Sequence, residues 1–245
     1  MKLLLLIRKL VLRLTHPHRF SSDAYIKHLR ASGCSIDEGT YFFNPIDTQI
    51  DVSRPYLLKI GKYCKITSGV HILTHDYSTS VIRMKYGKIL NTAKQTIIGD
   101  NVFIGIRSII MPGVTIGDNV IIGSGSIVTR DVPDNVVVGG NPAKIIMSTD
   151  EYKEKREGRM LEEAVLYAQN IKENKGKTPT IGEMGDFYPL YFAGSIDELN
   201  RLGFNIRCNG DNINQFNESI KNNAPQFNSF EDFLKYSLGS EKTKM

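Results

Sequence analysis

The sequence has few cysteines and no long apolar run, and both absences narrow its class. The three cysteines, Cys34, Cys64 and Cys208, are an odd number without C-x-x-C spacing, so the sequence suggests neither a disulfide framework nor a zinc knuckle. The N-terminal apolar run, Leu3–Ile7, is broken by two basic residues and followed by no A-x-A site. It is too short to span a bilayer and does not fit a secretory signal. A cytoplasmic protein is therefore expected.

A large excess of charge of one sign is also missing. The formal net charge is only +5, and the basic residues are interspersed with acidic ones along the chain. Nucleic-acid binders instead gather basic residues in a stripe on one face. The composition therefore predicts no nucleic-acid partner.

Residues 1–14 have the pattern of an amphipathic helix. At about 100° per residue, aliphatic side chains share one face and basic side chains another: Leu3, Ile7, Leu10 and Leu14 against Lys2, Lys9 and Arg13. Such a helix either rests on anionic lipid, as a peripheral contact at the inner face of the plasma membrane, or docks on its own protein or a neighbouring subunit. Both interpretations stay open.

The middle of the chain repeats every six residues. Downstream, aliphatic leading positions are followed four residues later by small or β-branched ones: Ile98, Ile104, Ile110, Ile116, Ile122 and Val128, then Val102, Ser108, Val114, Val120, Ser126 and Val132. The same frame assigns upstream leading positions to Ile36, Phe42, Thr48, Arg54, Ile60, Ile66 and Ile72, with Thr40, Ile46, Val52, Leu58, Cys64 and Val70 at the inner positions. Neither a helix nor a flat strand has this period. It predicts a parallel β-helix with stacked coils, and Cys64 as a buried apolar residue.

The two frames differ in phase, which predicts a loop extruded from one coil at about residues 76–96. We expect an N-terminal helical segment at 1–35, the β-helix at 36–148, and a helical and irregular extension at 149–245. In that extension, Ser148 is expected to cap a helix that continues to about Lys172. Two further helices are expected near 195–202 and 229–238.

The stretch from Ile36 to Ile146 resembles the hexapeptide-repeat acyltransferases, especially the galactoside, maltose and surface-polysaccharide O-acetyltransferases. Its most specific part begins IIGDNVFIGIRSIIMPGVTIG at Ile97 and ends GGNPAKII. The resemblance implies a left-handed β-helix, acetyl-CoA as donor, a sugar hydroxyl as acceptor and a homotrimer with sites between subunits. His75, in T-H-D at the phase break, matches the family's catalytic base. A positioned histidine base contributes roughly 10²–10⁴ in rate.

The resemblance also implies residues for the donor and the acceptor. The donor set comprises Phe103, Gly105, Ile106, Ser124, Thr129, Arg130 and Lys144. Within it, the Ile106 amide is the expected oxyanion donor, Arg130 and Lys144 are expected to meet phosphates, and Phe103 replaces the family's tryptophan. For the acceptor, Asp47 and Asp76 are expected to bind sugar hydroxyls, although aspartate is also favoured at corners for turn chemistry alone.

Other readings of the same residues remain. His71 and His75 lack a third histidine inside the repeats, so no zinc site is predicted. N-acylation of an amino or nucleotide sugar is an alternative reaction. A non-catalytic β-helix scaffold is an alternative of another class, and it does not account for a loop that interrupts the coils beside a histidine.

Overall fold

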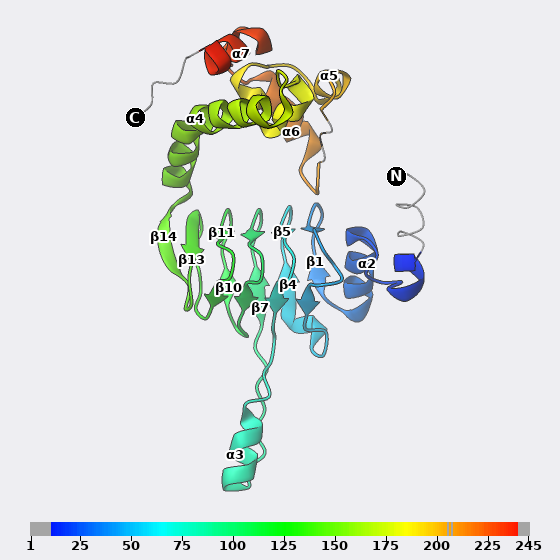
Figure 1. Ribbon diagram of the computed structural model, residues 1–245. Coiled ribbons are helices and arrows are strands. Elements are labelled where there is room, and N and C mark those ends of the chain that lie inside the picture. The colour runs from blue at the N-terminus through cyan, green and yellow to red at the C-terminus, as the bar shows by residue number, and fades with distance from the viewer. Residues whose placement is uncertain (1–10, 205, 207, 240–245) are drawn as a thin grey trace. The chain divides into compact units, whose positions relative to one another are not determined.

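The computed structural model describes residues 11–204, 206 and 208–239 (Figure 1). The chain divides into two compact units, Met1–Tyr152 and Lys153–Met245. An amphipathic helix is expected at residues 1–14, and residues 1–10 of it lie outside the described residues. Residues 11–15 are described and are helical. Within the described ranges, no helix is long and apolar enough to cross a membrane.

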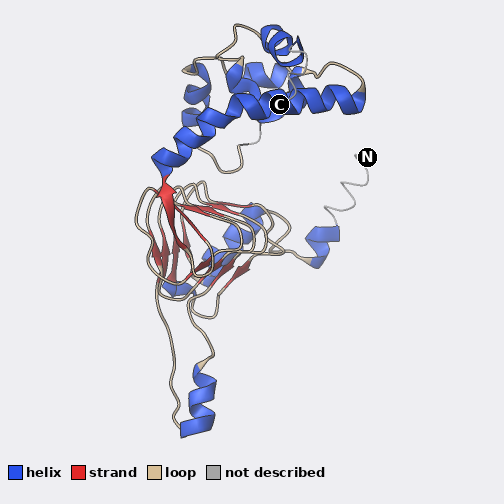
Figure 2. Cartoon of the chain, turned by 60° about the vertical axis from the view of Figure 1, so that its left-hand side comes forward, coloured by secondary structure: helices blue, strands red, loops and turns tan. Residues whose placement is uncertain are grey.

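The first unit is a parallel β-helix of three sheets, as the six-residue period predicts, and Figure 2 shows its triangular coils. Sheet A holds β1 (Ser35–Ile36), β4 (Leu58–Ile60), β7 (Thr96–Ile98) and β10 (Thr115–Ile116). Sheet B holds β2 (Tyr41–Phe42), β5 (Lys65–Ile66), β8 (Phe103–Ile104), β11 (Ile121–Ile122), β13 (Val136–Gly139) and β14 (Lys144–Ser148), the last of them antiparallel. Sheet C holds β3 (Gln49–Ile50), β6 (His71–Ile72), β9 (Ile109–Ile110) and β12 (Ile127–Val128).

Three edges join the sheets. We call the turns that lead from sheet A to sheet B the A–B edge, those from B to C the B–C edge, and those from C to A the C–A edge. The C–A edge comprises residues 51–57, 73–95, 111–114 and 129–131. The B–C edge includes residues 43–48, 67–70, 105–108 and 123–126.

The core is a ladder of buried leading residues. Ile60, Ile66 and Ile72 and their counterparts in later coils are at most 1% exposed, and Cys64 is fully buried among them, as predicted. Burial raises the pKa of the Cys64 thiol to about 11. Each aliphatic side chain lies on the equivalent residue of the next coil, so burial is continuous along the prism.

Glycine and asparagine close the A–B edge. A Cβ on Gly99 would lie 2.3 Å from the Oδ1 of Asp118, the atom that accepts a hydrogen bond from the backbone of Asp100 at 2.7 Å. Asn101 and Asn119 both have positive φ and are joined by a side-chain hydrogen bond of 2.8 Å. Asparagine tolerates this backbone region better than most residues. The turn is therefore repeated with little strain from coil to coil.

The first coil departs from the predicted frame. Thr48 is fully buried at a small inner position, and Ile50, not Thr48, is the leading residue of β3. Arg54 is a corner residue beside a short 3-10 helix, η1 (Pro55–Leu57), and Val52 is 42% exposed. The frame at Thr48, Arg54 and Val52 was therefore wrong. The corners at 43–48 and 51–57 are longer than their counterparts in the coils after the arm. The added residues bring the chain back into the six-residue phase at Ile60, but the residues between the two corners do not follow that phase.

The predicted loop is an arm that leaves the prism at the C–A edge and carries a short helix, α3 (Thr79–Tyr86), near its tip (Figure 1). At its base the backbone N–H of Lys94 donates to the carbonyl oxygen of Thr74 at 3.0 Å. Thr92 Oγ1 donates to the carbonyl oxygen of Asp76 at 3.2 Å. These two hydrogen bonds join the outgoing and returning segments at the root of the arm. At its tip, no residue of α3 is buried.

Helix α2 (Ser22–Ser32) packs on the first coil. Ser21 caps its first turn by accepting from the backbone of Ala24, and Gly33 ends it with a φ of 110°. Tyr25 and Leu29 are buried in the same core as β1 and β2, and the Tyr25 ring meets Phe42 edge-on. The helix covers apolar residues that the first coil would otherwise leave open.

The second unit is helical and has its own apolar core. Helix α4 (Thr149–Lys175) begins at the capping pair Ser148 and Glu151, as expected. It is followed by η2 (Ile181–Leu190), α5 (Ile196–Arg201), α6 (Ile213–Lys221) and α7 (Phe230–Gly239). The helices expected near 195–202 and 229–238 are α5 and α7, whereas η2 and α6 were not foreseen.

Candidate active site

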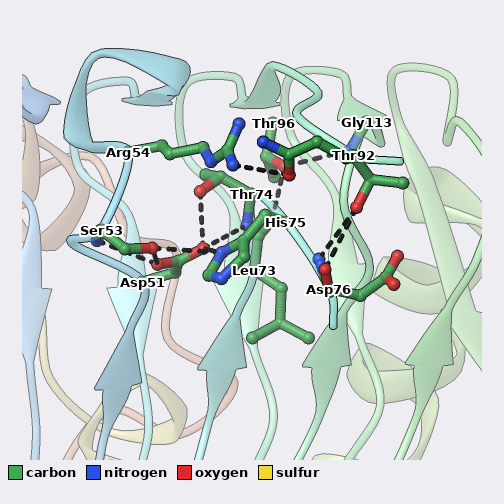
Figure 3. Close-up of polar contacts among 11 residues, drawn as sticks. Asp51, Ser53, Arg54, Leu73, Thr74, His75, Asp76, Thr92, Thr96 and Gly113 are labelled. Carbon is green, nitrogen blue, oxygen red and sulfur yellow. Dashed lines mark hydrogen bonds and ion pairs between the residues drawn. The ribbon is translucent and has the colours of Figure 1, made fainter. Parts of the chain in front are cut away.

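His75 lies at the root of the arm, on the C–A edge directly after β6. Its Nδ1 is 2.5 Å from Oδ2 of Asp51, which follows β3 in the coil beneath (Figure 3). The Asp51 side chain is 7% exposed and that of His75 is 33% exposed. The pair is therefore a shielded carboxylate that supports an imidazole open to solvent.

The Asp51 carboxylate is surrounded by donors. Its Oδ1 accepts from the backbone and hydroxyl of Ser53, and its Oδ2 accepts from the backbone and hydroxyl of Thr74 as well as from His75. Burial on its own raises the pKa of Asp51, but the hydrogen bonds from Ser53, Thr74 and His75 outweigh burial and hold this pKa well below its usual range. Asp51 is therefore ionised at neutral pH.

An ionised carboxylate only accepts hydrogen bonds, so His75 must carry its proton on Nδ1 to bond with Asp51. The Ser53 hydroxyl, 3.1 Å from the same nitrogen, lies beside this bond. The neutral imidazole then presents the lone pair of Nε2 away from Asp51. This tautomer suits a base that takes a proton from a bound hydroxyl.

Asp51, Ser53 and Thr74 were not foreseen. The resemblance pointed to Asp47 as a sugar-binding residue of the coil beneath the histidine, and the strict six-residue frame hid the longer corners of the first coil that bring Asp51 to His75. An aspartate directly after the true leading residue, Ile50, is the signal that would have indicated Asp51. Thr74, the residue before the histidine, is fully buried and would have been another.

Asp47 lies on the B–C edge, at the other end of the sheet C strands from His75. Its Oδ2 accepts from the Ser68 hydroxyl at 2.7 Å, and Ser68 also accepts from the Asn44 amide. Asp47 therefore does not join the His75 pair within one chain. This bond joins the first coil to the next one at this edge, and the role of Asp47 in sugar binding stays a prediction.

Asp76 directly follows His75 and turns toward the arm. Its Oδ1 accepts from the backbone and hydroxyl of Ser78, which lowers the pKa of Asp76. This contact starts the turn that leads into α3. His71 lies on β6 with its side chain exposed on the outer face of sheet C.

The seven donor residues expected from the resemblance do not lie together. Thr129 and Arg130 share the C–A edge with His75, and Gly105, Ile106 and Ser124 lie on the B–C edge. Phe103, which is 40% exposed, and Lys144 lie outward on sheet B. One chain therefore brings only part of this set to His75.

The Ile106 amide has the freedom that its expected role needs. Among the described residues, this N–H makes no hydrogen bond, whereas the N–H groups of Gly105 and Arg107 donate to the carbonyl oxygens of Ile122 and Ser68 in neighbouring coils. Gly105 lets the coils approach closely, since a Cβ there would be 2.5 Å from the backbone nitrogen of Ser124. The Ile106 side chain is 51% exposed, so the turn is open to a ligand.

Comparison with known proteins agrees with this fold. Residues 95–130 match the family described as bacterial transferase hexapeptide (six repeats). The chain is 48% identical to protein CapG of Staphylococcus aureus over 149 residues, which are 61% of this chain and 83% of CapG. It is 38% identical to the putative acetyltransferase YvoF of Bacillus subtilis over 105 residues, which are 43% of this chain and 56% of YvoF.

Among solved structures, the chain is similar to a maltose O-acetyltransferase from Clostridium difficile 630. The identity is 29%, the TM-score is 0.38, and the match covers 51% of this chain and 75% of the other. The repeat, the β-helix and the relatives together define an enzyme of the acyltransferase class. The chain belongs to the hexapeptide-repeat family of bacterial transferases.

Proposed function

We propose that the enzyme transfers an acetyl group from acetyl-CoA to a hydroxyl of a sugar unit in surface-polysaccharide synthesis, with His75 as the general base. The observation that carries the proposal is the contact between His75 Nδ1 and the ionised Asp51, which leaves Nε2 as the proton acceptor. A sugar hydroxyl is a poor nucleophile at neutral pH, so it needs such a base as it attacks the thioester.

The transfer is direct. His75 takes the hydroxyl proton while the sugar oxygen forms a bond to the thioester carbonyl carbon. The resulting oxyanion accepts a hydrogen bond from the Ile106 amide of a neighbouring subunit, and the tetrahedral intermediate then releases coenzyme A as its thiol, which receives the proton from His75. Asp51 holds the imidazolium in place while it carries that proton.

A homotrimer of left-handed β-helices supplies the complete site. His75, Thr129 and Arg130 lie on one edge of the prism, and Gly105, Ile106 and Ser124 on another. A ring that apposes the C–A edge of one chain to the B–C edge of the next unites the two sets. Arg130 and Lys144 then meet the phosphates of acetyl-CoA.

The test is release of free thiol from acetyl-CoA with a panel of sugars and oligosaccharides. We expect the His75→Ala variant to lose roughly 10²–10⁴ in kcat. His71→Ala is the matched control, because His71 is an exposed histidine on the adjacent strand, and its kcat should stay within about twofold of wild type. Both variants should keep the trimer by light scattering. Equal turnover of His75→Ala and His71→Ala would refute the proposal.

N-acylation of an amino sugar is the second candidate, since the same base serves an amine acceptor. Mass spectrometry of the product separates the two, because mild alkali removes an O-acetyl ester and leaves an N-acetyl amide.

A further inference from the structure

The segment around His75 has a local charge imbalance that the balanced whole-chain composition conceals. From Val52 to Gly99 the sequence contains a single acidic residue, Asp76, against eight lysines and arginines: Arg54, Lys59, Lys62, Lys65, Arg83, Lys85, Lys88 and Lys94. This stretch includes the whole arm and the corner beneath His75 except Asp51, whose carboxylate is bonded to His75. Arg54 and the four cations of the arm therefore lie on the same edge as His75, and cations favour an anionic ligand.

Arg54 lies next in sequence to a residue that contacts the base. It directly follows Ser53, whose hydroxyl is 3.1 Å from His75 Nδ1. One guanidinium nitrogen, Nη2, donates to Asn91 Oδ1 on the segment that returns from the arm to the prism, at 2.8 Å. Figure 3 shows the Arg54 side chain extended along the C–A edge past Thr74. The contact with Asn91 fixes the guanidinium where the arm meets the first coil.

The Arg54 charge is half-buried and unneutralised. Among the residues that the structure describes, no carboxylate lies within ion-pair distance of its guanidinium. The one neutral partner, Asn91, leaves further N–H donors of the planar fork available. A partly desolvated guanidinium that lacks an anion is costly, unless a ligand supplies the anion when it binds.

The position of Arg54 favours the acceptor over the donor. Along the C–A edge, Arg54 lies one coil before His75, whereas the expected phosphate contact, Arg130, lies two coils after it. If the donor extends from the base toward Arg130, the sugar hydroxyl must reach the base from the part of the C–A edge that the donor leaves open. The Arg54 side is therefore the side left for the sugar.

We propose that the acceptor sugar is anionic, and that Arg54 binds its carboxylate or phosphate group beside the hydroxyl that is acetylated. The inference deepens the proposed function and rests on it. Arg54 is then a specificity-determining residue, and it is positioned by the longer corner of the first coil. A carboxylate and a phosphate both match the guanidinium fork, so the acceptor is either a sugar acid or a sugar phosphate.

The experiment compares acceptors that differ only in charge: a hexose, the corresponding hexuronate, its uncharged hexuronamide and the hexose 6-phosphate, each with acetyl-CoA and wild-type enzyme. We expect kcat/KM for the hexuronate or the phosphate to exceed that for the neutral pair by about tenfold or more, since charge-assisted hydrogen bonds are the strong ones. Preference for the hexuronate or for the phosphate identifies the source of the anion.

The variants separate the acceptor role from other roles. Arg54→Gln should remove the preference by raising KM for the charged acceptor about tenfold, with KM for acetyl-CoA unchanged, and Arg54→Lys should restore part of it. Lys59→Gln is the matched control, because it removes one positive charge from the exposed outer face of β4, and it should leave both KM values as they are. Thermal melting checks that each variant is folded.

Three results would overturn the inference. Equal kcat/KM for charged and neutral acceptors would exclude an anion subsite and leave the proposed acetyl transfer intact. A rise in KM for acetyl-CoA in Arg54→Gln would assign the guanidinium to the donor. Thiol release that no sugar of the panel stimulates would remove the proposed function itself, and the inference with it.

Discussion

The first coil and the coils after the arm are built on the same three sheets but differ in their corners. The Cys64 amide contacts Thr40 in the coil beneath across 24 residues, whereas Asp100 contacts Asp118 in the coil above across 18. The extra residues of the first coil lie in its turns, not in its strands. The strands of both regions pair in the same parallel register.

This difference separates the regular coils, which support the fold, from the irregular coil, which contributes residues to the proposed site. The later coils repeat one turn, in which glycine, aspartate and asparagine satisfy each other's backbone groups. The longer corner of the first coil contains Asp51, Ser53 and Arg54, which contact His75 or the arm. The residues of the proposed base and acceptor site therefore come from the irregular coil and from the interruption above it.

The largest effect should come from the irregular coil. Asp51→Asn keeps the shape of the side chain but removes the charge that stabilises the His75 imidazolium, so kcat should fall roughly 100-fold. Steady-state kinetics at saturating acetyl-CoA would measure it. Asp37→Asn is the matched control, since Asp37 is exposed on the A–B edge, away from both edges of the proposed site, and its kcat should change less. Equal losses in both variants would argue against a special role for Asp51.

An intermediate effect is expected in the regular coils. An alanine at Gly99 would place its Cβ 2.3 Å from Asp118 Oδ1 and 2.8 Å from the backbone of Gly117. We expect Gly99→Ala to lower the free energy of unfolding by about 1–3 kcal/mol, as overpacking does. At Gly123 the nearest atom would be 3.4 Å away, so Gly123→Ala should be tolerated. Chemical denaturation of both variants checks this, and similar stabilities would contradict the role assigned to the Gly99 contact.

Much of the β-helix was predictable because its physics is local and repeated. The same slot recurs in each coil, so Ile104 and Ile122 can be recognised without knowledge of their neighbours. The phase break between Ile72 and Ile98 predicted the arm for the same reason. Capping residues are also local, and Ser148 and Ser195 begin α4 and α5 as expected.

The rest of the candidate site depends on contacts between coils, which a six-residue period does not specify. Asp51 and His75 are brought together because the irregular first coil stacks under the next one, so a strict frame did not reveal Asp51. The extra residues in the first coil kept the phase at Ile60, which made the error invisible in the sequence. The division of the donor residues between two edges likewise follows from the order of the sheets, which no single hexad reveals.

The smallest effect should come from the arm, where the comparison is sharpest. Val81 and Met84 in α3 are 64% and 84% exposed, whereas Ile104 in β8 is fully buried. The pair Val81→Ser and Met84→Ser should change the free energy of unfolding by less than about 0.5 kcal/mol, against about 2–5 kcal/mol for Ile104→Ala. Urea denaturation at several protein concentrations measures both. If the α3 variants destabilise the protein in a concentration-dependent way, a second copy covers the helix, and the arm belongs to the assembly instead of to its own chain.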